Sequence, residues 1–123
     1  MWVFLPFGFY SVVCDKTATG ATEYDTVLVR GRVKRHMTVL VEEIGRLGQW
    51  KPSIVEHSGT DYRYRIVMLK TAWADVVQKL TMKIDYTNFK NEASDEVDKC
   101  GYVDALHQVW ATMYELQPNR GAK

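Results

Sequence analysis

The sequence predicts an α+β fold, a two-layer sandwich in which about three helices pack on one face of a mainly antiparallel sheet. Segments with alternating side chains cluster at two places, within residues 1–33 and within residues 51–70. Segments with apolar residues at three- and four-residue spacing lie between and after these clusters. The resulting order is strands, helix, strands, helix, helix, which favours an antiparallel sandwich over a doubly wound parallel fold.

Length and composition predict one domain. The 123 residues are 46% hydrophobic, which is enough to bury a core without disulfides or metal. We expect a single compact domain over residues 1–117 and a frayed tail over residues 118–123. The formal net charge of +1 gives no global basic field, so a charged partner has to be met by a local patch.

The first strands are expected at the start of the chain. The segment "MWVFLPFGFYSVVC" is apolar, but it lacks the basic start of an export signal and is interrupted by Pro6 and Gly8. We expect a buried strand or strand pair, with Trp2 and Phe4 on one side of the pleat. A turn around Gly20 then joins it to the strand "TVLVRGRV", so that these segments form a hairpin.

The first helix is predicted from Lys34, because apolar residues recur at helical spacing up to Leu47. Gly48 follows where a C-terminal capping glycine belongs.

A second pair of strands is predicted after Pro52. "KPSIVEH" predicts a short strand, and a turn at "SGTD" connects it to the strand "DYRYRIVMLK". Alternation in that strand groups four residues on the inner face, under the helices: Tyr62, Tyr64, Ile66 and Met68.

Two further helices are predicted in the second half of the chain. One runs from about Thr71, and the other begins near Ser94 as an N-cap and continues to the region of Pro118. Residues from both helices are expected to share one core: Trp73, Val77, Leu80, Leu106, Trp110 and Met113.

The cysteines predict neither a metal site nor a disulfide. Cys14 and Cys100 are far apart in sequence, and neither has a second ligand at zinc-binding spacing. We expect two reduced, packed and unpaired thiols, and a cytoplasmic location without a membrane span.

No catalytic motif is recognisable in the sequence. The glycines do not form a phosphate-binding loop, and His36, His57 and His107 fall on separate elements. Glu42 and Glu43 are adjacent in a helix and therefore diverge, so a solvated face is expected for both. We expect no enzymatic activity and no cofactor.

Arginines alternate on two of the expected strands and suggest a binding surface. Arg30 and Arg32 alternate on one strand, and Arg63 and Arg65 on the other. If these strands are neighbours, their four guanidiniums share the uncovered face and could bind carboxylates or phosphates. The alternative is a solvent-facing sheet whose arginines pair with local Asp and Glu.

The segment "IDYTNFKN" is a second candidate for recognition. Tyr86, Asn88 and Lys90 could form a polar edge that faces a partner. The alternative is an anchored connection between two helices, in which Asn88 bonds nearby backbone.

Six segments together, "MWVF", "GFYSVV", "LVRGRV", "DYRYRIV", "IDYTNFKN" and "LHQVWATMYELQ", resemble a family of small uncharacterised proteins of bacteria and their phages. The resemblance covers nearly the whole chain. It implies a compact protein often carried by mobile elements, and it supplies no catalytic residue.

Two classes of function are therefore expected. The first is a non-enzymatic protein, such as a phage or prophage accessory factor, that docks on a host or phage protein complex and inhibits a host system such as a CRISPR defence complex. The alternative is a domain that binds RNA or a phosphorylated ligand through a Tyr/Arg sheet face, in which case nucleic acid is the partner.

Overall fold

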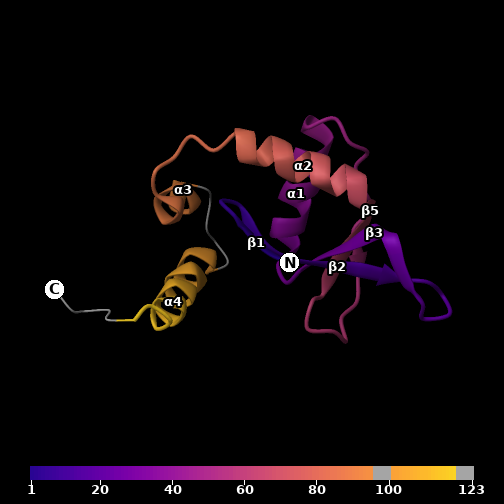
Figure 1. Ribbon diagram of the computed structural model, residues 1–123, viewed down its shortest axis with the longest axis horizontal. Helices are drawn as coiled ribbons and strands as arrows, with labels where there is room; N and C mark the ends of the chain where they lie inside the picture. Colours follow the sequence, from indigo (N-terminus) through magenta and orange to yellow (C-terminus); the bar gives the residue numbers. More distant parts are fainter. Residues whose placement is uncertain (96–100, 119–123) are drawn as a thin grey trace. The chain divides into compact units, whose positions relative to one another are not determined.

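The structure is a computed structural model that describes residues 1–95 and 101–118 (Figure 1). Contacts divide the chain into two units, residues 1–85 and residues 86–123, and each is described by itself. The single domain expected over residues 1–117 stays a prediction.

The first unit contains a five-stranded sheet in the order β1-β2-β3-β5-β4, with antiparallel pairing between all neighbours. The strands are β1 (Trp2–Leu5), β2 (Gly8–Lys16), β3 (Thr22–Gly31), β4 (Val55–Glu56) and β5 (Tyr64–Leu69). Together with the helices below, this sheet confirms the expected α+β class, and the described residues contain four helices rather than about three.

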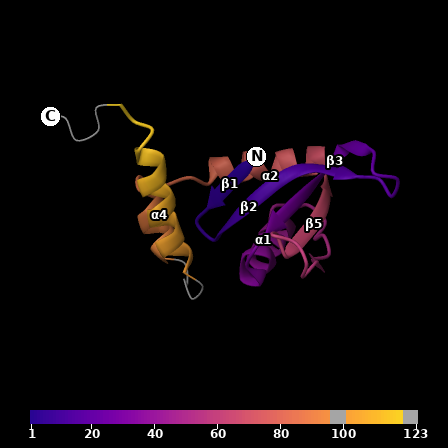
Figure 2. The same cartoon turned by 90° about the horizontal axis from the view of Figure 1, so that it is seen from below.

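The hairpin of β2 and β3 turns at Gly20, as the sequence predicts. Gly20 has a φ of 88°, a left-handed conformation that suits glycine. The Thr17 N–H donates to the Ala21 carbonyl at 2.8 Å and closes the turn. The hairpin reaches beyond both helices of this unit (Figures 1 and 2).

Helices α1 (Lys34–Arg46) and α2 (Lys70–Met82) pack on one face of the sheet, which we call the inner face. The end of α1 confirms the expected glycine cap: Gly48 has a φ of 94°, and the N–H groups of Gly48 and Gln49 donate to the carbonyls of Gly45 and Ile44. These two bonds form a Schellman motif, which satisfies carbonyls that the helix leaves free.

Alternate residues of three strands supply the core of this unit. Side chains of α1 and α2 complete a single buried cluster: Tyr10, Val12, Val27, Val29, Met37, Leu40, Ile44, Ile66, Met68, Trp73 and Val76. Val77 and Leu80 pack against it, half-buried. The core therefore forms between the inner face and two helices.

Two expectations for the N-terminal half are wrong. Trp2 and Phe4 do share one side of β1, but they pair with Ser11 and Phe9 on the face opposite to the helices, so Trp2 is exposed. Cys14 is free, as expected, but exposed rather than packed. It lies in β2 opposite Val27, beside an irregular register step after Cys14.

The second unit contains α3 (Phe89–Asp95) and α4 (Tyr102–Tyr114), which contact each other. The helix expected to start at Ser94 is therefore wrong, because that residue lies within α3. The side-chain oxygen of Asn88 accepts a bond from the Asn91 N–H at 3.1 Å and caps α3 instead. Cys100 lies outside the described residues.

A core common to α2 and α4 stays a prediction, because the two helices belong to different units. Trp73 and Leu106 are buried, but Trp110 is 54% exposed and Met113 is 57% exposed. Within the unit, the seven residues of α3 are too few to cover an apolar stripe that runs along the thirteen residues of α4.

None of the described helices is long and apolar enough to cross a membrane.

Replacing Ile44 tests the core. Ile44 is fully buried between α1 and the sheet, so Ile44→Ala should lower the free energy of unfolding by about 2 to 5 kcal/mol. Arg35→Ala, on the exposed side of the same helix, should change it by no more than about 0.5 kcal/mol. Urea denaturation of both variants gives the comparison, and equal losses would contradict this core.

A pH titration tests the contact between Gln49, which follows α1, and Asp75 in α2. The Asp75 carboxylate accepts a bond from Gln49 at 2.9 Å and pairs with Lys79 at 3.0 Å. The bond from Gln49, followed by that from Lys79, holds the pKa of Asp75 below its ordinary value of 3.8. Because the folded-state pKa is the lower one, the contact stabilises the fold above the unfolded-state pKa. This contribution is lost as the pH falls through the folded-state pKa.

We expect the Asp75 pKa, measured by NMR, to rise toward its ordinary value in Gln49→Ala. An unchanged pKa would show that Gln49 does not stabilise the carboxylate.

Candidate functional site

One row of side chains crosses the whole sheet on its outer face, opposite to the helices. Register places one residue of every strand in this row, which we call the arginine row: Trp2 of β1, Ser11 of β2, Arg30 of β3, Arg65 of β5 and Val55 of β4. Arg30 and Arg65 are directly opposite each other, so β3 and β5 are neighbours as the sequence hypothesis requires.

An apolar row lies beside the arginine row on the outer face, and neither helix of the first unit covers it. Both helices of the first unit lie on the inner face, and all of its residues 1–85 are described. Beside the arginine row, Val13, Leu28 and Val67 form a second row across β2, β3 and β5, and Val67 is 46% exposed. An exposed apolar surface of this kind is typical of a binding face.

Arg30 and Arg65 use few of their donors within the protein. One terminal nitrogen of Arg30 donates to the Ser11 hydroxyl at 2.7 Å. One terminal nitrogen of Arg65 donates to the Thr60 hydroxyl at 3.1 Å and to the Tyr62 carbonyl at 3.0 Å. The Nε atoms of both arginines are buried and have no hydrogen-bond partner among the described residues.

Tyr62 lies against two of the arginines rather than under the helices. The guanidinium carbons of Arg30 and Arg32 are 4.5 Å and 4.2 Å from the centre of its ring, and the ring is buried. The expectation that Tyr62 faces inward with Tyr64 is therefore wrong. Strand β5 begins only at Tyr64, so the alternation that orients Ile66 and Met68 does not extend back to Tyr62.

Arg32 joins the same surface. Its Nε donates to the Asp61 carbonyl at 3.1 Å, and its guanidinium also approaches the Phe9 ring. Cation–π contacts and backbone bonds thus attach the segment before β5 to the outer face.

Arg63 differs from the other three arginines because it has an acidic partner. Its guanidinium pairs with Glu56 at 2.7 Å, and this hydrogen bond and charge raise the pKa of Arg63. Among the described residues, Arg30, Arg32 and Arg65 form no ion pair. Pairing with local carboxylates, the alternative considered for the arginines, therefore applies to Arg63.

The residues singled out in "IDYTNFKN" belong to the second unit. Asn88 caps α3, and Tyr86 lies 6.3 Å from Phe89 between ring centres. The Lys90 ammonium lies 4.6 Å from the centre of the Trp110 ring. These contacts agree with an anchored connection, and a role of Tyr86, Asn88 and Lys90 in binding stays a prediction.

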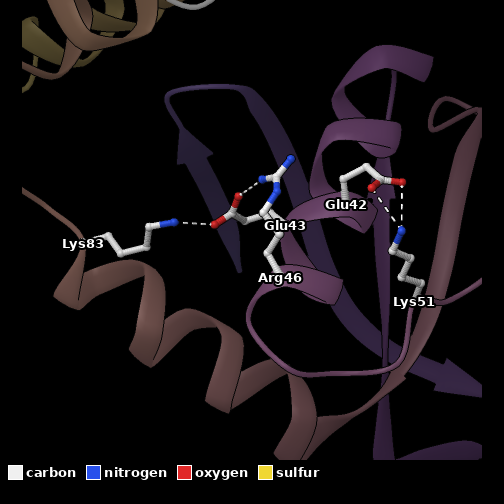
Figure 3. Close-up of polar contacts among 5 residues, drawn as sticks. All are labelled: Glu42, Glu43, Arg46, Lys51 and Lys83. Atoms are coloured by element: carbon white, nitrogen blue, oxygen red, sulfur yellow. Dashed lines mark hydrogen bonds and ion pairs between the residues drawn. The ribbon is translucent and has the colours of Figure 1, made fainter.

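Glu43 is the main buried charge, and the solvated position expected for it is wrong. The side chain is 9% exposed and pairs with Lys83 at 2.6 Å and with Arg46 at 2.5 Å (Figure 3). Neighbouring Glu42 points elsewhere and pairs with Lys51 at 3.0 Å, with both side chains exposed. The side chains of Arg46 and Lys83 are more than half exposed. We therefore interpret these ion pairs as a structural link between α1 and the residue after α2, and not as a catalytic centre.

The histidines do not come together. His36 is buried, and its Nδ1 accepts a bond from the Phe9 N–H at 3.4 Å, whereas His57 and His107 are exposed. Among the described residues, no group of three His, Cys, Asp or Glu side chains could hold a metal ion.

Comparisons of the chain with protein-family models, with curated proteins and with solved structures give no match. The resemblance to small bacterial and phage proteins stays a prediction.

The two adjacent glutamates allow a matched test of the buried ion pairs. Glu43→Gln removes a buried carboxylate that accepts two charged hydrogen bonds, so it should lower the free energy of unfolding by about 1 to 3 kcal/mol. Glu42→Gln weakens an exposed pair and should cost less than about 1 kcal/mol. Thermal and urea denaturation give both values, and equal effects would show that burial of Glu43 adds nothing.

Proposed function

We propose that this protein is a non-enzymatic binding protein whose outer sheet face docks on an acidic, partly apolar surface of another protein. One observation supports this most directly. Arg30, Arg32 and Arg65 lie together on the outer face, beside an apolar row, and have no acidic partner among the described residues. A partner that supplies carboxylates and apolar side chains complements this face in both respects.

A protein partner suits this face better than RNA. Sheet-face recognition of RNA needs exposed aromatic rings on which bases stack. The Tyr62 ring is buried and Tyr64 packs against the core, so neither tyrosine expected to stack on RNA is presented, and Trp2 is the exposed aromatic ring of the arginine row. Exposed Val13, Val67 and Leu69 offer apolar contacts to a protein instead.

The resemblance of the chain to small bacterial and phage proteins suggests where such a partner is found. A host protein complex, such as a CRISPR defence complex, is the source we propose for the acidic surface. Binding that covers a working surface of the complex would inhibit it without any chemical step.

Matched bait variants test the proposal. Tagged wild type, the double variant Arg30→Gln and Arg65→Gln, and the double variant Lys34→Gln and Arg35→Gln are purified from the bacterial host. Protein and nucleic acid in each sample are then identified separately. The second pair removes the same charge from the exposed start of α1 and serves as the control.

We expect one protein to co-purify with wild type and with the α1 control but not with the outer-face variant. With the purified partner, the outer-face variant should bind at least about tenfold more weakly, and added salt should weaken wild-type binding. If the partner co-purifies with all three tagged proteins, the outer face is not the binding surface. Recovery of RNA that only the outer-face variant loses would favour the nucleic-acid alternative.

A further inference from the structure

We infer that Arg30 and Arg65 together form a binding site for one carboxylate, the group by which an acidic side chain of the partner is recognised. This inference names the chemistry of the proposed docking face and in that respect rests on the proposed function. The site itself is a property of the free protein, so it can be tested without the partner.

The register of β3 and β5 creates the site. Arg30 and Arg65 are paired residues of neighbouring antiparallel strands, which places their Cα atoms about 4.5 to 5.5 Å apart. Like charges directly opposite each other in a sheet repel. Within the described part of the chain, no acidic side chain offsets this repulsion, whereas nearby Arg63 has Glu56.

Unused donors make the pair suited to an oxyanion. Arg30 donates to Ser11, and Arg65 donates to Thr60 and Tyr62, in each case through a single terminal nitrogen. The other donors have no partner among the described residues, and both Nε–H groups are buried without one. A carboxylate that approaches from solvent accepts bonds from the free terminal N–H groups of the two guanidinium forks and offsets the repulsion.

Contacts of the two arginines hold them in place before a ligand arrives. Arg30 is held by Ser11 and by the Tyr62 ring, and Arg65 is held by the loop before β5. Side chains that are already ordered lose less conformational entropy on binding. The site is therefore preorganised, which a pair of freely rotating surface arginines is not.

The surroundings favour a carboxylate on an apolar protein segment. Val55 lies next to Arg65 in the arginine row, and the row of Val13, Leu28 and Val67 lies alongside. Exposed Trp2 is two strands from Arg30, about 10 Å away at ordinary strand spacing. A glutamate or aspartate flanked by apolar residues matches this arrangement.

NMR titration of the free protein with acetate tests the site. The resonances of the arginine Nε–H groups are followed at constant ionic strength while chloride is replaced by acetate. We expect saturable shifts for Arg30 and Arg65 and small, unsaturated shifts for the exposed Arg35 and Arg63. Equal shifts of all arginines would show general screening and would overturn the site.

Charge-preserving variants separate the arginine fork from simple charge. Arg30→Lys keeps the positive charge but loses the planar fork, so it should weaken acetate binding, read from the Arg65 resonance, by about tenfold. Arg63→Lys is the matched control and should leave the Arg30 and Arg65 shifts unchanged. If Arg30→Lys binds acetate as well as wild type, the fork is not the recognition element and the inference fails.

Inorganic phosphate distinguishes the two oxyanions that arginine forks bind. Saturation by acetate supports a protein carboxylate, whereas saturation by phosphate with no response to acetate would overturn that assignment. Acetate binding can also persist when no partner protein depends on Arg30 and Arg65. In that case the carboxylate site stands and the proposed docking function fails, so the two failures are distinguishable.

Discussion

The strict alternation of side chains across a five-stranded antiparallel sheet determines where most features of the larger unit lie. One set of alternate residues, including Val29 and Ile66, meets α1 and α2 and forms the core. The other set, including Arg30 and Arg65, is turned to the open face in the same register. Burial of the first set thus fixes the position of the second, because a slip by one residue would bring both arginines into the core.

The arginines of the outer face stabilise the fold and also lie on the surface that we propose binds a partner. Arg32 and Arg65 bond backbone carbonyls of the segment before β5, and Arg30 and Arg32 contact the Tyr62 ring. These contacts account for part of the arginine chemistry without any partner. They do not account for the missing carboxylates or for the buried Nε–H groups of Arg30 and Arg65. That remainder, together with the apolar row of Val13, Leu28 and Val67, is what makes the face a binding surface in our proposal.

Two adjacent carboxylates near the end of α1 lie in very different surroundings. Glu42 and Glu43 are adjacent, yet Glu42 forms an exposed pair with Lys51, whereas the carboxylate of Glu43 is buried between Arg46 and Lys83 (Figure 3). Successive helical residues diverge by about 100°, so only one of them can face the second helix. Lys83 is forty positions from Glu43, and no local pattern in the sequence announces their contact.

The sequence by itself determined the α+β class, the hairpin at Gly20, the helix that ends before Gly48 and the inward set of Ile66 and Met68. These features follow from local chemistry: alternation, helical spacing and the need for glycine at a positive φ. Tertiary structure alone decided that Arg30 and Arg65 are direct neighbours and that Glu43 is buried. It also decided that Tyr62 does not follow the alternation of β5 and instead contacts Arg30 and Arg32. Each of these depends on which strand or helix lies alongside, and such long-range pairing is set by the packing of the whole unit rather than by the residues next in sequence.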